Sequence, residues 1–151
     1  MEFQERIGRL MAIALKGLRA ELDERLSEVG VPFHAYLVLR HVAAYPDASQ
    51  RCLAHRLGIE GSTLTHHFDR LAADGLIERV RSSTDRRVWS AVLTPLGKER
   101  LAAADEVAAT ADDHLRSHFS EAELGTLTDA LQRITDIYGR PRRDHDHPGP
   151  D

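Results

Sequence analysis

Small hydroxyl side chains and a histidine gather in one short segment near the middle of the chain. Ser62, Thr63, Thr65 and His66 lie close together, and Arg70 follows one helical turn later. Hydroxyl and imidazole groups donate and accept hydrogen bonds, so they can contact the edges of bases, whereas a guanidinium pairs with phosphate. The segment therefore has the side chains of a helix that enters the major groove, which is about 12 Å wide and admits one helix.

A second polar and basic group lies further along the chain, where Asp85-Arg86-Arg87 follows Ser82-Ser83-Thr84. Alternating apolar runs flank the group, so the pattern predicts that it forms the tip of a β-hairpin. One of the two arginines can enter the minor groove, whose negative potential attracts arginine. The other could pair with Asp85 and hold the shape of the loop.

Capping and turn signals define the elements that must position these groups. Ser49 is a predicted N-cap, Gly58 fits a tight turn between helices, and Asp74-Gly75 ends a helix. Residues 120–123 form a capping box. Together with the apolar periodicity, these signals predict helices over 2–29, 33–44, 49–57, 61–73, 95–118 and 121–138, and strands over 76–81 and 88–93.

The order of these elements predicts a mainly α fold with a small β wing of two to three strands. Residues 33–94 are predicted to form a winged helix–turn–helix domain that binds DNA. Residues 1–32 and 95–139 are predicted to form an all-helical dimerisation region, and residues 140–151 a disordered tail. The terminal helices carry long apolar stripes that a single copy cannot cover, so we expect an intertwined homodimer.

The charge distribution is compatible with a phosphate-binding surface, although the formal net charge of the chain is −4. Residues 49–100 contain nine Lys and Arg against six Asp and Glu, whereas residues 101–151 contain five against eleven. Screening limits the reach of a charge to about 8–10 Å, so a locally basic face can bind DNA in an acidic protein.

Several function classes lack their sequence signals. The chain has no apolar run of membrane-spanning length and no signal-peptide pattern at its start, so we expect a cytoplasmic protein without a membrane partner. Its one cysteine, Cys52, excludes a disulfide framework and is interpreted as a small buried apolar residue. A Gly-rich phosphate loop, a His-Glu-x-x-His motif and a nucleophile elbow are absent, so we expect neither an enzyme nor a cofactor.

The order and spacing of these residues resemble the MarR family of bacterial transcription regulators. The matching positions are Ser49-Gln50-x-x-Leu53-Ala54-x-x-Leu57-Gly58, Ser62-Thr63-x-Thr65, Asp69-Arg70-Leu71-x-x-Asp74-Gly75-Leu76-Ile77-x-Arg79, Asp85-Arg86-Arg87 and Val92-Leu93-Thr94-x-x-Gly97. The resemblance implies a homodimeric winged-helix regulator, often a repressor, that binds a near-palindromic operator and is released by a small ligand. This chain departs from many members in having His66-His67 where they have arginine.

By position, the resemblance also implies the residues that contact DNA. Ser62, Thr63, Thr65 and His66 would face bases, and Arg70 would face phosphate. Arg86 would enter the minor groove from the wing tip, with Asp85 and Arg87 supporting it. The alternative is a winged-helix protein–protein interaction module, which would expose apolar residues on the helix over 61–73.

The effector is open between two classes of ligand. The family's pocket between the dimer helices and the winged domain would take a small aromatic or phenolic ligand, and its candidate residues here are Lys16, Arg19, His34, Tyr36 and His41. A zinc-responsive regulator is the second interpretation, because His114 and His118 are four residues apart on a predicted helix, a spacing that suits a metal ion. Its further candidate ligands are Glu24 and His41.

Overall fold

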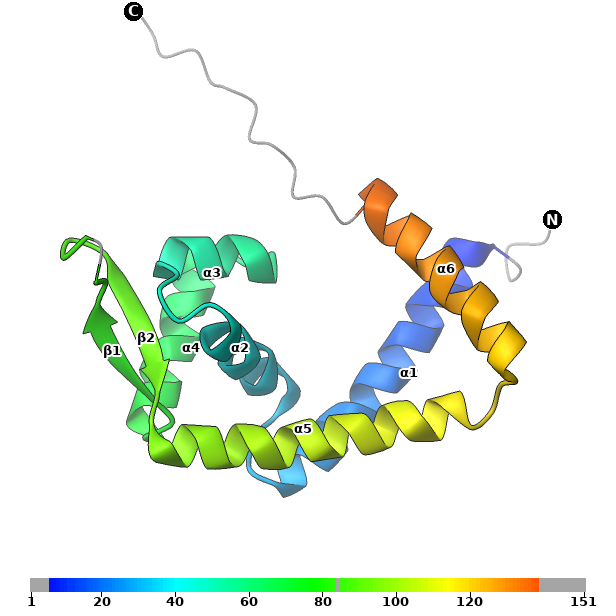
Figure 1. Cartoon of the computed structure of the whole chain (residues 1–151), viewed down its shortest axis with the longest axis horizontal. Coiled ribbons are helices and arrows are strands. Elements are labelled where there is room, and N and C mark those ends of the chain that lie inside the picture. The colour runs from blue at the N-terminus through cyan, green and yellow to red at the C-terminus, as the bar shows by residue number, and fades with distance from the viewer. Residues whose placement is uncertain (1–5, 84, 139–151) are drawn as a thin grey trace, which may run out of the picture. The chain divides into compact units, whose positions relative to one another are not determined.

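Six helices and one β-hairpin make up the described part of the chain, which in this computed structural model comprises residues 6–83 and 85–138. This architecture confirms the predicted mainly α fold with a small β wing (Figure 1). In chain order the elements are α1 (Ile7–Glu28), α2 (Phe33–Ala44), α3 (Gln50–Leu57), α4 (Gly61–Ala73), β1 (Ile77–Arg81), β2 (Trp89–Leu93), α5 (Pro95–Arg116) and α6 (Glu121–Tyr138).

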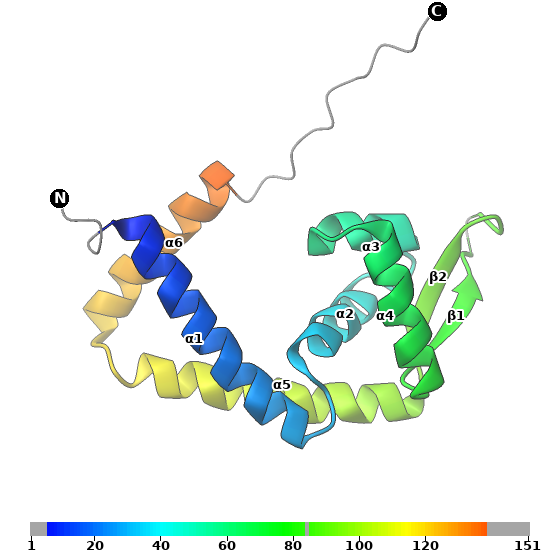
Figure 2. The same ribbon diagram turned by 180° about the vertical axis from the view of Figure 1, so that it is seen from behind.

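The core lies where α2, α3 and α4 pack against one another and against the hairpin (Figures 1 and 2). Leu64, Phe68 and Leu71 recur at three- and four-residue steps along α4, and all three are buried. They therefore hold one face of α4 inward and leave the opposite face exposed. The core also takes in Leu26 of α1 and Leu101 of α5.

Local capping signals fix both ends of α3. The Ser49 hydroxyl accepts a hydrogen bond from the Cys52 N–H at 3.1 Å, which confirms the predicted N-cap of α3. Gly58 ends α3 with a φ of 67°, a left-handed conformation that costs glycine little. The turn between α3 and α4 is thereby set by the sequence itself.

The hairpin is antiparallel, with Ile77 opposite Leu93 at its base and Arg81 opposite Trp89 near its tip. Ser90 of β2 is buried, with only 2% of its surface exposed. Its hydroxyl lies 3.2 Å from the carbonyl oxygen of Pro46 and 3.0 Å from that of Ala48. This contact ties the wing to the loop that precedes α3.

Thr94 joins the start of α5 to the turn that ends α4. Its hydroxyl donates to the Gly75 carbonyl oxygen at 2.6 Å and accepts from the Gly97 N–H at 2.9 Å, so it also caps α5. Gly97 is buried, and a Cβ atom there would overlap the Leu76 carbonyl oxygen. Close packing between α5 and the start of β1 therefore requires glycine at this position.

The end of α5 differs from the prediction of a helix to residue 118. The helix ends at Arg116, where the N–H groups of His118 and Phe119 bond to the carbonyl oxygens three residues earlier. These tighter bonds close the last turn, so His114 and His118 do not lie on one helix. The predicted tail over 140–151 lies outside the described residues.

The start of α6 is confirmed as a capping box. The Ser120 N–H donates to Glu123 Oε2 at 2.8 Å, and the Glu123 N–H lies 3.4 Å from the Ser120 hydroxyl oxygen. The Ser120 hydroxyl also donates to Glu123 Oε2 at 2.8 Å, and the bonds from the Ser120 N–H and hydroxyl lower the pKa of the Glu123 carboxyl group. The boundary between His114 and Leu115 divides the chain into two compact units, and α6 belongs to the second.

Apolar side chains of the terminal helices are exposed in the single chain. Only Leu26 is buried in α1, and none of the α6 residues is buried. Leu10 and Ile13 of α1 are 52% and 51% exposed, and Leu131 of α6 is 45% exposed. None of the helices in the described part of the chain combines the length and the apolarity that a membrane span requires.

Candidate nucleic-acid interface

The face of α4 opposite the core carries the hydroxyl and imidazole groups singled out in the sequence. Ser62, Thr63, His66 and Arg70 are exposed, whereas Thr65 is half-buried. Glu60 precedes the helix without a side-chain cap, so its carboxylate accepts no hydrogen bond from the first N–H groups of α4. The exposed face of α4 is thus polar throughout its N-terminal half and can supply hydrogen bonds to base edges and phosphates.

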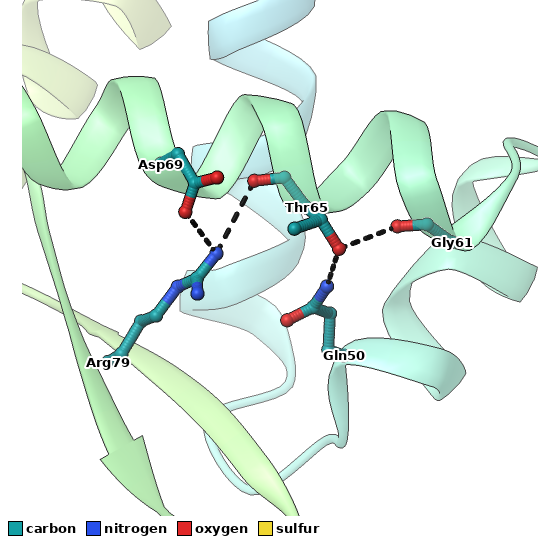
Figure 3. Close-up of polar contacts among 5 residues, drawn as sticks. All are labelled: Gln50, Gly61, Thr65, Asp69 and Arg79. Atoms are coloured by element: carbon teal, nitrogen blue, oxygen red, sulfur yellow. Dashed lines mark hydrogen bonds and ion pairs between the residues drawn. The ribbon is translucent and has the colours of Figure 1, made fainter.

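Thr65 is held by two neighbouring elements (Figure 3). Gln50, the first residue of α3, donates from Nε2 to the Thr65 hydroxyl oxygen at 2.5 Å. Arg79 of β1 donates from Nη2 to the Thr65 main-chain oxygen at 3.3 Å and pairs with Asp69 at 2.7 Å. The middle of α4 is therefore connected to both α3 and the wing.

The wing tip carries its two arginines outward, since Arg86 and Arg87 are both exposed. Asp85 supports the loop through the main chain: its carboxylate accepts from the Arg87 N–H at 2.9 Å. Asp85 is thus bonded to the backbone rather than paired with an arginine side chain, because an aspartate readily closes a turn onto an N–H two residues later. Both guanidinium groups are thereby left at the surface.

Further down the wing, Arg81 lies 3.8 Å from the centroid of the Trp89 ring. This contact spans the first pair of residues below the tip, because Arg81 and Trp89 face each other across the two strands. A cation over an indole face is stabilising. It stiffens the strands that carry the exposed arginines.

A stacked pair of histidines connects α2 with α4. The rings of His34 and His67 lie 5.1 Å apart between centroids with an interplanar angle of 28°, and the His66 ring lies 6.3 Å from that of His67. Burial lowers the pKa of His67, and the nearby imidazoles of His34 and His66 lower it further. The sequence offered no signal for this pair beyond the count of histidines.

Comparison with known proteins identifies the family. The MarR family model matches residues 29–88, which include α2, α3, α4 and β1. The crystal structure of the transcriptional regulator PA3341 is 35% identical, with a TM-score of 0.76, and the match covers 89% of this chain and all of that one (100%). The chain belongs to the MarR family.

Two further relatives of this MarR-family chain are themselves named as transcription regulators. The DNA-bound structure of the transcriptional repressor CouR is 27% identical, with a TM-score of 0.82 over 89% of this chain and 95% of that one. A protein of Thauera aromatica, named for transcriptional regulation of the hcr operon, is 33% identical over 105 residues, or 70% of this chain. The chain spans 63% of the length of that relative.

A groove between α1 and α2 brings together three of the five residues predicted for an effector pocket. Lys16, Arg19 and His34 line an open groove of about 500 Å³ together with apolar side chains, among them Leu15 and Phe33. The Arg19 guanidinium lies 5.0 Å from the centroid of the Phe33 ring. Asp23 also lines the groove, and its carboxylate accepts from the Phe33 N–H at 2.7 Å. The groove thus combines two cationic side chains, Lys16 and Arg19, with an aromatic face, which suits a planar anion.

The other two predicted pocket residues lie elsewhere. The Tyr36 hydroxyl donates to Asp105 Oδ1 of α5 at 3.0 Å, and burial, followed by this bond, raises the pKa of Tyr36. His41 Nδ1 lies 2.8 Å from the Leu37 carbonyl oxygen, one turn earlier in the same helix. Both side chains are directed by contacts that keep them out of the groove walls.

Among the described residues, no group of three or more His, Cys, Asp or Glu side chains is arranged to hold a metal ion. The candidates were Glu24, His41, His114 and His118. His114 and His118 lose their shared helical face because α5 ends at Arg116, and His41 is directed to the Leu37 carbonyl oxygen. The geometry of the described chain therefore offers no zinc site built on these residues.

Sequence reasoning gave Gln50 and Arg79 only as matching positions of the family pattern and assigned them no role. Gln50 stands directly after a helix cap, and Arg79 lies between Glu78 and Val80 on a predicted strand. Neither pattern indicates a contact with Thr65, because the partners meet only after α3, α4 and β1 have packed together.

Proposed function

We propose that this MarR-family chain acts in the cytoplasm as a homodimeric, sequence-specific DNA-binding regulator. The observation that carries the proposal is the exposed polar face of α4 beside a wing tip with two outward arginines. A helix of this kind reads base edges in the major groove while a wing arginine enters the adjacent minor groove. In this arrangement Ser62, Thr63, His66 and Arg70 contact DNA from α4, and Arg86 and Arg87 from the wing.

The exposed apolar faces of α1 and α6 support the dimer. In a monomer the apolar side chains of Leu10, Ile13 and Leu131 remain exposed to water, which is unfavourable. A second copy with the same faces can cover them. In this proposal residues 33–94 form the DNA-binding domain, and residues 1–32 and 95–139 form the dimerisation region. A two-fold dimer presents two α4 helices to half-sites about 34–36 Å apart, so the operator is near-palindromic.

The groove between α1 and α2 supports release by a small ligand. Its cationic and aromatic lining matches an aromatic or phenolic anion, and His34 on its wall stacks on His67 of α4. A ligand that displaces His34 would therefore change the packing of the helix that contacts bases. Repression followed by ligand release is the regulatory mode that this connection favours.

Selection of bound sequences from a random DNA pool tests the proposal, with the mass of the protein–DNA complex measured on the selected duplex. We expect a near-palindromic consensus and two protein copies per duplex. A selection that enriches no sequence would contradict DNA binding and favour the alternative of a protein–protein interaction module. A complex with a single protein copy per duplex would contradict the proposed homodimer.

A further inference from the structure

The one proton of the Thr65 hydroxyl and one of its two acceptor lone pairs are already used within the protein. Its one proton is donated to the Gly61 carbonyl oxygen at 2.9 Å, and its oxygen accepts from Gln50 Nε2 at 2.5 Å (Figure 3). A hydroxyl has a single donor, so Thr65 cannot donate to a base without giving up the bond to Gly61. Its role is therefore different from that of the exposed hydroxyls of Ser62 and Thr63.

The Gln50 carboxamide, in contrast, has most of its hydrogen-bonding capacity unused. In the described part of the chain its side chain makes one hydrogen bond, to Thr65, which takes one of its two Nε2 protons. Figure 3 shows the carboxamide oxygen turned away from Thr65. One N–H and one C=O thus remain side by side on a group whose orientation is fixed.

The position of this group is fixed from a second side as well. Arg79 holds the main-chain oxygen of Thr65 and the carboxylate of Asp69, so the turn of α4 that supports Gln50 is tied to β1. Three elements of the winged domain therefore meet at Thr65. Such preorganisation reduces the entropy lost when a side chain binds.

The free edge of Gln50 matches adenine better than phosphate. Adenine presents an N6 donor and an N7 acceptor in the major groove, and a carboxamide pairs with both at once. A phosphate offers acceptors only, so it would use the N–H and leave the carboxamide oxygen facing an anion. The first helix of a helix–turn–helix commonly crosses the backbone, which makes phosphate the competing partner.

We infer that Gln50, oriented by the Thr65 hydroxyl, reads one adenine in the major groove of each half-site. Thr65 is then a positioning residue, and it contacts no base through its hydroxyl. This inference rests on the proposed DNA-binding function and adds a specificity-determining residue outside α4.

The experiment repeats the selection from a random pool with the wild-type chain and with Gln50→Ala, Gln50→Glu, Thr65→Val and Thr65→Ser. Affinities for the selected duplex are then measured with each of the four base pairs at the assigned position. Gln132→Ala, which removes the same side chain from an exposed site on α6, is the matched control. Thermal unfolding by circular dichroism verifies that every variant folds.

We expect Gln50→Ala to abolish the preference for adenine, a loss of about 5- to 150-fold in discrimination, the range of a bidentate contact. Gln50→Glu should move the preference to cytosine, because a carboxylate accepts from the cytosine N4 amino group. Thr65→Val should lower the discrimination by about 2- to 10-fold, the effect of one hydrogen bond, and Thr65→Ser should retain it.

Two results would overturn the inference and differ from a failure of the proposed function. If Gln50→Ala selects the wild-type consensus with an equal loss of affinity for all sequences, Gln50 contacts phosphate. If Gln50→Ala changes neither consensus nor affinity, Gln50 does not touch DNA. A wild-type chain that enriches no sequence would instead overturn the proposed function, and the inference with it.

Discussion

The imidazole rings of His34 and His67 are stacked, with their centroids 5.1 Å apart. His34 lines the groove between α1 and α2, and His67 belongs to α4, whose exposed face carries the candidate DNA contacts. The two rings are thus a direct connection between a cavity that fits a ligand and the helix that we assign to base recognition. Protonation of His67 places a positive charge against the ring of His34.

The stability of the fold should therefore depend on pH through His67. Because its pKa is lowered in the folded chain, the unfolded chain binds the proton first as the pH falls below the ordinary histidine pKa of about 6.5. The contribution of His67 to stability is therefore fully present above that pH and is lost as the pH falls further, through the lowered pKa of the folded chain. Urea unfolding at each pH measures it, and His67→Gln should flatten the profile, whereas His55→Gln at an exposed site of α3 should leave it. An unchanged profile in His67→Gln would assign the dependence to other groups.

Replacement of the wing-tip arginine should weaken DNA binding. We expect Arg86→Ala to cost about 1–3 kcal/mol of binding free energy, and to cost most for operators rich in A·T under the wing, where the minor groove is narrow. Fluorescence anisotropy with a labelled duplex measures the loss. Arg133→Ala, which removes an exposed arginine from α6, should bind normally. Equal affinities for the two variants would exclude a wing contact by Arg86.

A charge on the apolar face of α6 should separate the proposed dimer. Leu131→Glu would bury a carboxylate without a partner, which costs about 3 kcal/mol or more and raises the dimer dissociation constant by about two orders of magnitude. Sedimentation equilibrium measures that constant. Arg133→Glu introduces the same side chain on the polar side of α6 and should leave the dimer intact. A Leu131→Glu chain that remains fully dimeric would show that α6 takes no part in the interface.

Replacement of two helical glycines by alanine should change the free energy of unfolding in opposite directions. Gly97→Ala places a Cβ against the Leu76 carbonyl oxygen, and we expect a loss of about 1–3 kcal/mol or more of unfolding free energy. Gly125→Ala on α6 meets no atom within 4 Å and should gain about 0.5–1 kcal/mol from the lower entropy of its unfolded chain. Thermal melts of both variants compare the two effects. Similar melting temperatures would mean that α5 moves to accommodate the extra methyl group.

The groove between α1 and α2 should bind aromatic carboxylates through its cationic side chains. Salicylate is a suitable probe for isothermal titration calorimetry, with salicylamide as the uncharged analogue. Arg19→Ala should lower the affinity by about 10- to 150-fold, the range of a charge-assisted hydrogen bond, whereas Arg25→Ala outside the groove should not. The absence of heat at millimolar salicylate would exclude this class of ligand.

The sequence predicts best where one residue acts on its own neighbours. Ser49 caps α3 and Ser120 with Glu123 caps α6, because each contact lies within four residues of the chain. The buried face of α4 follows in the same way from the spacing of Leu64 and Phe68. Such local and periodic signals are sufficient for the order of elements and for the polar face of α4.

Side chains whose partners lie far along the chain escape such reasoning. Tyr36 was assigned to a ligand pocket, yet its hydroxyl bonds to Asp105, 69 residues later. Thr65 is predicted to face bases, and the pattern gives no sign that its hydroxyl oxygen accepts from Gln50, 15 residues earlier. The helix over 95–118 was too long by two residues, because the periodic pattern contains no signal for the tight turns at Arg116.

Thr94 connects two segments of the chain through one side chain. One side chain holds the last turn before the wing and the first turn of α5, so neither can slide past the other without breaking a bond of 2.6 or 2.9 Å. A displacement of the first turn of α5 would therefore be transmitted through Thr94 to the turn that joins α4 to the wing.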